Sequence, residues 1–95
     1  MLINKPHQSG DIVSIKTMSG DELVGKFESE TDTHYHLMTP MALAHTAQGL
    51  GLVPYMFTVD PGNVVMIDKR SVVTIVNTHT EMAKDYLSKV TGIAL

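Results

Sequence analysis

The 95-residue sequence contains no cysteine, which excludes disulfides, thiolate zinc sites and a cysteine nucleophile. This composition is compatible with a reducing compartment, and we expect a cytoplasmic protein. No apolar run approaches the roughly 18 residues of a membrane-spanning helix, and residues 1–10 lack the charged and apolar blocks of a signal peptide. The sequence therefore predicts a soluble, unsecreted protein with no membrane partner.

Positive charge is also scarce. Seven lysines and arginines stand against ten aspartates and glutamates, which gives a net charge of −3 with the histidines neutral. Such a chain has no general electrostatic attraction to phosphate backbones. Any binding of nucleic acid must therefore come from a local patch.

Catalytic motifs are missing as well. The sequence has no nucleophile elbow, no phosphate-binding glycine loop and no convincing acid/base pair. We expect a protein that is not an enzyme and has no cofactor. His34 and His36 have a metal-like spacing, with His45, His79 or Asp32 as a conceivable third ligand. Nothing fixes that convergence, so solvated histidines are the better interpretation and no metal site is predicted.

Two stretches near the start alternate apolar and polar residues, over residues 11–18 and 22–29. A period of two indicates half-buried strands. Gly20 lies in the polar turn between them and permits a positive φ, which favours a hairpin. Gly25 lies inside the second strand, where glycine usually marks a bulge, a tight bend or a close backbone approach. These features predict a sharply bent sheet that closes towards a small barrel.

Further strands are expected after this hairpin. They cover residues 35–44, 52–59 with a continuation over 64–67, and 72–77. Pro40 interrupts the third strand and belongs at an edge or bulge, because proline cannot donate to a ladder. Residues 45–51 are expected to be a flexible connection. Residues 60–63 are either a bulge or a hairpin turn, and a hairpin turn would change the strand count.

The C-terminal end predicts a helix over residues 78–92. Thr78 and Glu81 have the spacing of a capping box, and Gly92 is a plausible stop. An apolar stripe at helical spacing follows the box: Met82 or Ala83, Tyr86, Leu87 and Val90. The strand over 72–77 is apolar on both faces, so its second face needs a cover, either this helix or a neighbouring subunit.

The expected architecture is a single domain over residues 1–95. It is mainly β: an N-terminal arm over 1–10, a strongly bent five-stranded antiparallel barrel over 11–77, and the C-terminal helix packed over one end or edge. The seven methionines are interpreted as core fillers, since most occur inside strand patterns.

This order of elements resembles the Sm/LSm family of small SH3-like barrels, to which the Hfq-related proteins belong. Gly20 and Gly25 match the two glycines of the family's first motif, and residues 32–36 can be laid on its D-x-H loop with one inserted residue. The family's usual asparagine in this loop is replaced by His36. Family members usually carry their helix before the first strand, whereas here the helix comes last.

The family's second motif is matched in part. Ile67, Val72 and Ile75 have its apolar spacing, while Asp68 and Lys69 stand where the family has arginine and glycine. The resemblance implies a homo-oligomeric ring, formed by edge pairing between the fourth strand of one subunit and the fifth of the next. It also implies single-stranded RNA binding near the central hole.

The resemblance, carried over position by position, gives a candidate nucleic-acid site of six residues: Asp32, His34, Tyr35, His36, Lys69 and Arg70. His34 would stack on a base, Tyr35 would turn into the barrel and His36 would hydrogen-bond a base edge. The fold would bring Lys69 and Arg70 beside this loop, where a cation contacts phosphate or stacks under the same base. The alternative interpretation is a polar loop and a charged turn that simply face water.

The sequence thus leads to two hypotheses. The first is non-catalytic binding of single-stranded RNA or DNA by a cyclic homo-oligomer of this chain, in a role such as RNA processing. The second is a protein-assembly module on the same barrel with no nucleic-acid ligand, which the acidic charge favours.

Overall fold

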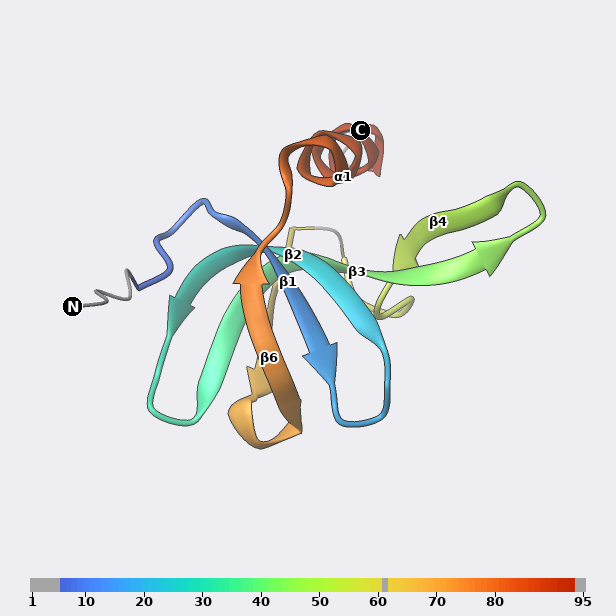
Figure 1. Ribbon diagram of the computed structural model, residues 1–95. Helices are drawn as coiled ribbons and strands as arrows, with labels where there is room; N and C mark the ends of the chain where they lie inside the picture. The colour runs from blue at the N-terminus through green and yellow to red at the C-terminus, as the bar shows by residue number, and fades with distance from the viewer. Residues whose placement is uncertain (1–5, 61, 94–95) are drawn as a thin grey trace.

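The computed structural model describes residues 6–60 and 62–93. It is mainly β with one C-terminal helix, as predicted (Figure 1). The elements, in chain order, are β1 (Ile12–Thr17), β2 (Glu22–Glu30), β3 (His34–Thr46), β4 (Gly49–Pro54), β5 (Val64–Asp68), the 3-10 turn η1 (Lys69–Ser71), β6 (Val72–Asn77) and α1 (Thr80–Ile93). Residues 6–10 of the predicted arm contain no strand, and residues 1–5 lie outside the described part of the chain.

The strands form one antiparallel sheet of six members, so the prediction of five strands was wrong. The order is β4-β3-β2-β1-β6, and β5 also pairs with β3. β5 lies along residues 34–38 of β3, and β4 lies along residues 41–46. The predicted flexible connection was also wrong, because β3 and β4 form a hairpin with only Ala47 and Gln48 between them.

A bend in β3 explains why the predicted fourth strand is divided. Thr39 has a positive φ of 46°, which is unusual for a β-branched residue, and Pro40 follows it without an amide to donate. The two halves of β3 consequently run in different directions (Figure 1). One straight partner cannot follow both halves, so β4 ends at Pro54 and pairing resumes at Val64. β4 and β5 both pair with β3 and do not pair with each other in the described sheet, so they do not form a hairpin. The Asn63 amide donates to the Asp60 carbonyl (3.2 Å), and Pro61, within the stretch predicted to be a bulge or a turn, lies outside the described residues.

Gly25 lies at a close approach between β2 and β3, one of the features that the sequence predicted for this glycine. A Cβ at this position would lie 3.2 Å from the Leu37 Cδ1 atom and 3.4 Å from the Pro40 Cα atom. The β2–β3 register shifts here, between Val24 and Lys26. The absence of a side chain lets β3 fold closely over β2, and Pro40 lies at the resulting irregularity, where it was expected.

The sheet is strongly bent but not closed, so the barrel prediction was wrong in this respect. β6 pairs with β1 and β5 pairs with β3, and no ladder joins β5 to β6 in the described topology. The two edges are connected along the chain by η1, whose backbone bonds to both sides. The Lys69 amide donates to the Thr33 carbonyl (2.8 Å), and the Met18 amide donates to the Ser71 carbonyl (2.7 Å).

Two apolar clusters hold the fold together. The inner cluster lies in the hollow of the bent sheet: Val13, Ile15, Leu23, Phe27, Leu37 and Ile67. The outer cluster lies beneath α1: Val24, Met41, Leu52 and Tyr86. Tyr86 is 1% exposed, and its hydroxyl donates to the carbonyls of Met38 (2.9 Å) and Thr39 (2.8 Å). The helix thus packs on the outer face of the bend and binds the backbone where β3 turns.

The start of α1 differs from the predicted capping box. Thr78 is still extended, since its amide donates to the Ile12 carbonyl (2.9 Å) and its hydroxyl bonds the Ser14 hydroxyl (2.7 Å). The Met82 amide donates instead to Nδ1 of His79 (3.3 Å). The β1–β6 ladder therefore retains the threonine that was predicted to begin the helix. No helix in the described part of the chain is long and apolar enough to cross a membrane.

The outward face of β6 stays open. Val73 and Val76 are 61% and 54% exposed, and the cluster beneath α1 contains no β6 residue. The helix is therefore not the cover that the doubly apolar strand was expected to have.

Candidate nucleic-acid interface

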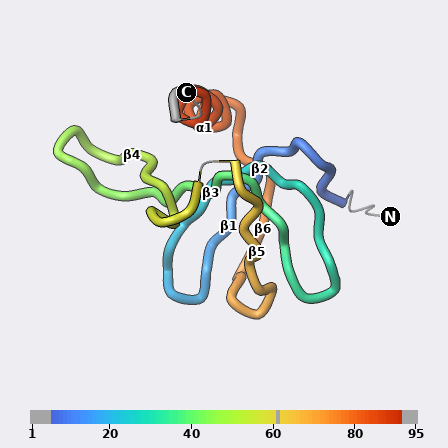
Figure 2. Tube along the Cα trace, turned by 180° about the vertical axis from the view of Figure 1, so that it is seen from behind, coloured from blue at the N-terminus to red at the C-terminus, as the bar shows by residue number. Residues whose placement is uncertain are grey.

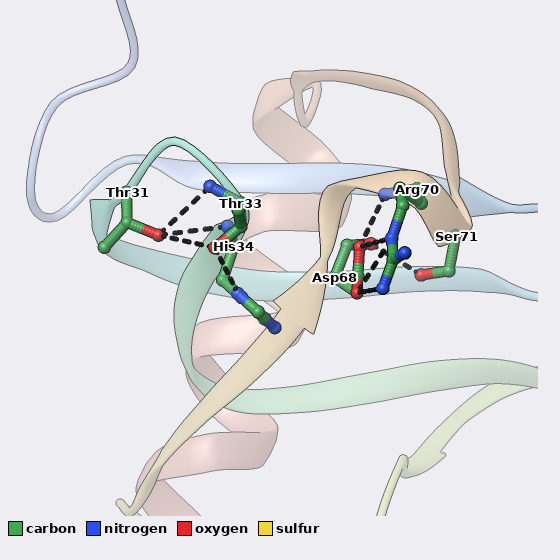
Figure 3. Close-up of polar contacts among 6 residues, drawn as sticks. All are labelled: Thr31, Thr33, His34, Asp68, Arg70 and Ser71. Atoms are coloured by element: carbon green, nitrogen blue, oxygen red, sulfur yellow. Dashed lines mark hydrogen bonds and ion pairs between the residues drawn. The ribbon is translucent and has the colours of Figure 1, made fainter.

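The predicted meeting of the histidine segment with the Lys69 corner is confirmed within one chain. In the β3–β5 ladder His34 lies opposite Asp68, and His36 lies opposite Met66. Figure 3 shows the Thr31–His34 contacts and the Asp68–Ser71 contacts side by side at one end of these strands. Two segments more than thirty residues apart in sequence therefore share one surface.

Threonines order the loop that precedes His34. The Thr31 hydroxyl accepts from the amides of Thr33 (3.3 Å) and His34 (3.1 Å), and the Thr31 amide donates to the His34 carbonyl (2.9 Å). The Thr33 hydroxyl bonds Nδ1 of His34 at 2.8 Å. This bond orients the imidazole. None of the described contacts engages Nε2, so this nitrogen can bond a ligand. Asp32 lies exposed between the two threonines.

Alternation along the strands divides the site into two faces. Tyr35 points inward and packs against the inner cluster, as expected. His34 and His36, both half-buried, point to the other face. Their partners Asp68 and Met66 lie on that same face, where Met66 is 63% exposed. The outward surface is therefore a shallow platform of two imidazoles, a thioether and a carboxylate.

Arg70 adjoins this surface through its bonds to Asp68. Asp68 accepts bonds from its amide (2.8 Å), its Nε (3.1 Å) and its Nη2 (2.8 Å). The side-chain bond from Arg70 holds the pKa of Asp68 well below its usual range, and the same pair raises the pKa of Arg70. The Arg70 side chain is nevertheless 91% exposed. It presents a guanidinium to solvent while two of its five donors, on Nε and Nη2, bond Asp68.

Lys69 contacts Glu30 and the inward-facing residue Tyr35. Its Nζ lies 2.6 Å from Glu30 Oε2 and 5.0 Å from the centre of the Tyr35 ring. The hydrogen bond with Glu30 raises the pKa of Lys69. Lys69 therefore caps Tyr35 and is paired, and it does not project as a free cation. Only the β2–β3–β5 register brings Glu30 to a lysine 39 positions away, so no local pattern in the sequence indicates this pair.

The local charge of the site is slightly negative. Three carboxylates, those of Glu30, Asp32 and Asp68, accompany the cations Lys69 and Arg70. Each cation is paired with one of these carboxylates. Stacking and base-edge bonds, which need no excess positive charge, are thus the chemistry that the surface offers most directly.

The histidines do not converge with other ligands in the described residues. Within residues 6–60 and 62–93, no three side chains of His, Cys, Asp or Glu are grouped to hold a metal ion. The chain matches no protein-family model, and no curated protein matches it. The resemblance to the Sm/LSm family therefore rests only on the sequence positions given above.

Proposed function

We propose that this chain is a non-catalytic subunit that binds single-stranded RNA or DNA, within a cyclic homo-oligomer in the cytoplasm. One observation carries the proposal: the histidine-bearing end of β3 and the Asp68–Arg70 corner form one outward surface. The surface combines flat aromatic groups with an exposed guanidinium, and these are the groups on which unpaired bases stack.

Base stacking on His34 and His36 is the main proposed contact. Such stacking is worth ~1–3 kcal/mol per base and tolerates any sequence. Nε2 of His34 can bond a base edge, because Nδ1 is engaged by Thr33. Arg70 can stack beside the same base or reach a phosphate without leaving Asp68 completely, since a guanidinium has five donors. Binding should therefore depend only weakly on salt.

Free strand edges support self-association. Among the strands of residues 6–60 and 62–93, β5 pairs only with β3 and β6 only with β1, so in this part of the chain each leaves one row of backbone donors and acceptors without a ladder. Open edges of this kind pair readily with another chain. Exposed apolar side chains flank them, namely Val64 and Met66 on β5 and Val73 and Val76 on β6. Pairing β5 of one subunit with β6 of the next would cover both edges and repeat around a ring.

The test is fluorescence anisotropy with labelled oligouridine and oligoadenine. We expect His34→Ala to weaken binding by about tenfold, which corresponds to the loss of one stacked base. His45→Ala is the matched control, because His45 is an exposed histidine of the same strand near the tip of the β3–β4 hairpin. Equal affinities for the two variants, or no binding by the wild type at low salt, would refute the proposed site.

The ion pairs favour a second candidate, a protein-assembly module. Because Lys69 and Arg70 already have carboxylate partners, the surface attracts phosphate poorly. A wild-type protein that assembles but fails to bind either oligonucleotide would support this second candidate and exclude the first.

A further inference from the structure

The longest stretch without a charged side chain forms the most projecting part of the molecule. Residues 33–59 contain no Asp, Glu, Lys or Arg. They form β3, β4 and the segment that follows β4. The β3–β4 hairpin extends away from the body of the sheet (Figure 1), and residues 55–60 lie at its base, seen from behind in Figure 2. The net charge of the chain is −3, and this hairpin and the segment after it carry none of its charged side chains before Asp60.

An exposed apolar patch lies at that base, and we call residues 55–59 the Phe57 patch. Phe57 is 78% exposed, more than any other large apolar residue described. Tyr55, Met56 and Val59 beside it are also exposed. Four apolar side chains within five residues exceed the scattered single residues that are normal on a monomer surface. The patch therefore indicates a contact surface.

A hollow lies directly against the patch. It measures about 190 Å³ and is lined mainly by apolar side chains. Its walls include Pro40, Met41, Pro54, Met56, Phe57 and Val65. An apolar cavity of ~150 Å³ is large enough for a benzene molecule. The hollow thus has the size and chemistry to receive one phenyl ring.

Charge favours a second copy of the chain as the occupant. Two copies with the same net charge repel each other over most approaches, and like charges brought together at an interface are costly. The uncharged run is the surface on which two copies meet with the least repulsion. Asp60 lies at the rim of the hollow and is exposed, where its carboxylate can stay in water.

The position of Phe57 at the edge of its own hollow determines the symmetry of the contact. A projecting group and a receiving hollow on the same patch are self-complementary, and a self-complementary patch closes as a two-fold dimer. We propose that two copies dock face to face through this patch, with Phe57 of each copy filling the hollow of the other. The hollow includes Val65 of β5, but the contact needs no backbone pairing along β5 or β6. It can therefore join two lone chains or two rings, and it does not depend on the proposed function.

Cross-linking tests the contact directly, because the chain has no cysteine of its own. Thr58→Cys keeps Phe57 and places one thiol beside it. With a short bismaleimide, we expect most of the Thr58→Cys chains to become covalent dimers. The control is Met18→Cys, at a position that is 71% exposed in the β1–β2 turn and should give few dimers. Equal cross-linking of the two variants would overturn the proposal.

Light scattering on the full chain provides the second measurement. Phe57→Asp should halve the mass of the wild-type assembly, whereas Met18→Asp, an equally exposed position that gains the same charge, should leave it unchanged. Far-UV circular dichroism should be the same for all three proteins, because neither side chain is buried. An unchanged mass for Phe57→Asp would overturn the face-to-face contact.

The two modes of association can be separated by their masses. If the ring fails and the contact holds, the wild type is a dimer that Phe57→Asp converts to a monomer. If the contact fails and the ring holds, Phe57→Asp keeps the wild-type mass, and a substitution on the β6 edge such as Val73→Lys lowers it.

Discussion

Gly25 is the residue on which the bend of the sheet depends most. A methyl group at this position would press on Leu37, which is fully buried, and on the backbone of Pro40. Neither neighbour can move without disturbing the inner cluster or the turn of β3. We expect Gly25→Ala to lower the free energy of unfolding by about 1–3 kcal/mol, the usual cost of overpacking, as measured by urea denaturation.

Gly51 provides the control for this substitution. A Cβ there would also lie 3.2 Å from a side-chain carbon, but that carbon is the Cγ2 atom of the exposed residue Thr46. The Thr46 hydroxyl bonds the Gly49 carbonyl and the Gln48 amide, but the residue lies at the surface and can shift outward without disturbing a core. Gly51→Ala should therefore change stability by less than about 1 kcal/mol in either direction. If the two substitutions cost the same, the close approach at Gly25 does not limit the fold.

Tyr86 makes stability depend on alkaline pH. Burial raises its pKa from 10.0 to about 12, so the folded state holds the phenolic proton more tightly than the unfolded state. The stabilisation of the folded state by the protonated phenol is fully present below pH 10, and it is lost as the pH rises from 10 towards 12. Across that interval the free energy of unfolding of the wild type should fall by on the order of 2 kcal/mol more than that of Tyr86→Phe.

Thermal and urea unfolding of both proteins between pH 7 and pH 12 measure this difference. At pH 7 Tyr86→Phe should be less stable by about 1–2 kcal/mol, because two backbone carbonyls lose their donor. The two stability curves should converge as the pH approaches 12. A gap that stays constant with pH would show that the hydroxyl does not titrate as the burial of Tyr86 requires.

At the scale of elements, the strands and the helix could be predicted because alternation and helical spacing are local signals. The division between β4 and β5 could not, although both stretches read as extended. It depends on the positive φ of Thr39. A β-branched residue rarely adopts this conformation, and no sequence pattern here predicts it. The helix start was displaced for a similar reason, since Thr78 joins the ladder of β1.

In the candidate site, too, contacts between distant residues could not be predicted from local patterns. The sequence brought His34, His36 and the Lys69–Arg70 turn together through the expected order of strands. It missed the role of Glu30 as the partner of Lys69, which lies 39 positions away. Pairing of side chains across strands depends on register, and bulges in β2–β3 shift that register twice. The residues present in the site could thus be predicted more reliably than the ion pairs they form.

The ion pair in the corner between β5 and η1 yields a prediction of its own. Asp68→Asn should free Arg70 and strengthen oligouridine binding at low salt. The slope of log affinity against log salt should steepen by about 0.7, the value for one added phosphate contact on a single strand. Anisotropy titrations between 50 and 200 mM salt, on the order of the range in which such slopes are usually measured, give both quantities.

Asp85→Asn is the control for the corner. It removes the same charge from an exposed position on α1, away from the β3–β5 surface. If Asp68→Asn and Asp85→Asn raise affinity equally, the gain reflects net charge alone, and Arg70 has no specific part in binding.

For the whole molecule, the open sheet is the central structural fact. A closed barrel would have satisfied its own edges, whereas in the described sheet β5 and β6 are each paired on one side only. The apolar residues Val73 and Val76 beside the β6 edge remain exposed. A small domain in this state gains stability from association, so we expect light scattering at micromolar concentration to give several times the 10.4 kDa mass of one chain.

Hydrogen–deuterium exchange with mass spectrometry, with and without saturating oligouridine, tests the central claim most directly and works on an assembly of any size. We predict that bound oligouridine slows exchange in peptides covering residues 31–38 and 66–71, and that peptides from the β3–β4 hairpin and α1 do not change. Slower exchange confined to the hairpin or to α1, or no change at saturation, would contradict a binding surface built from the histidine loop and the Asp68–Arg70 corner.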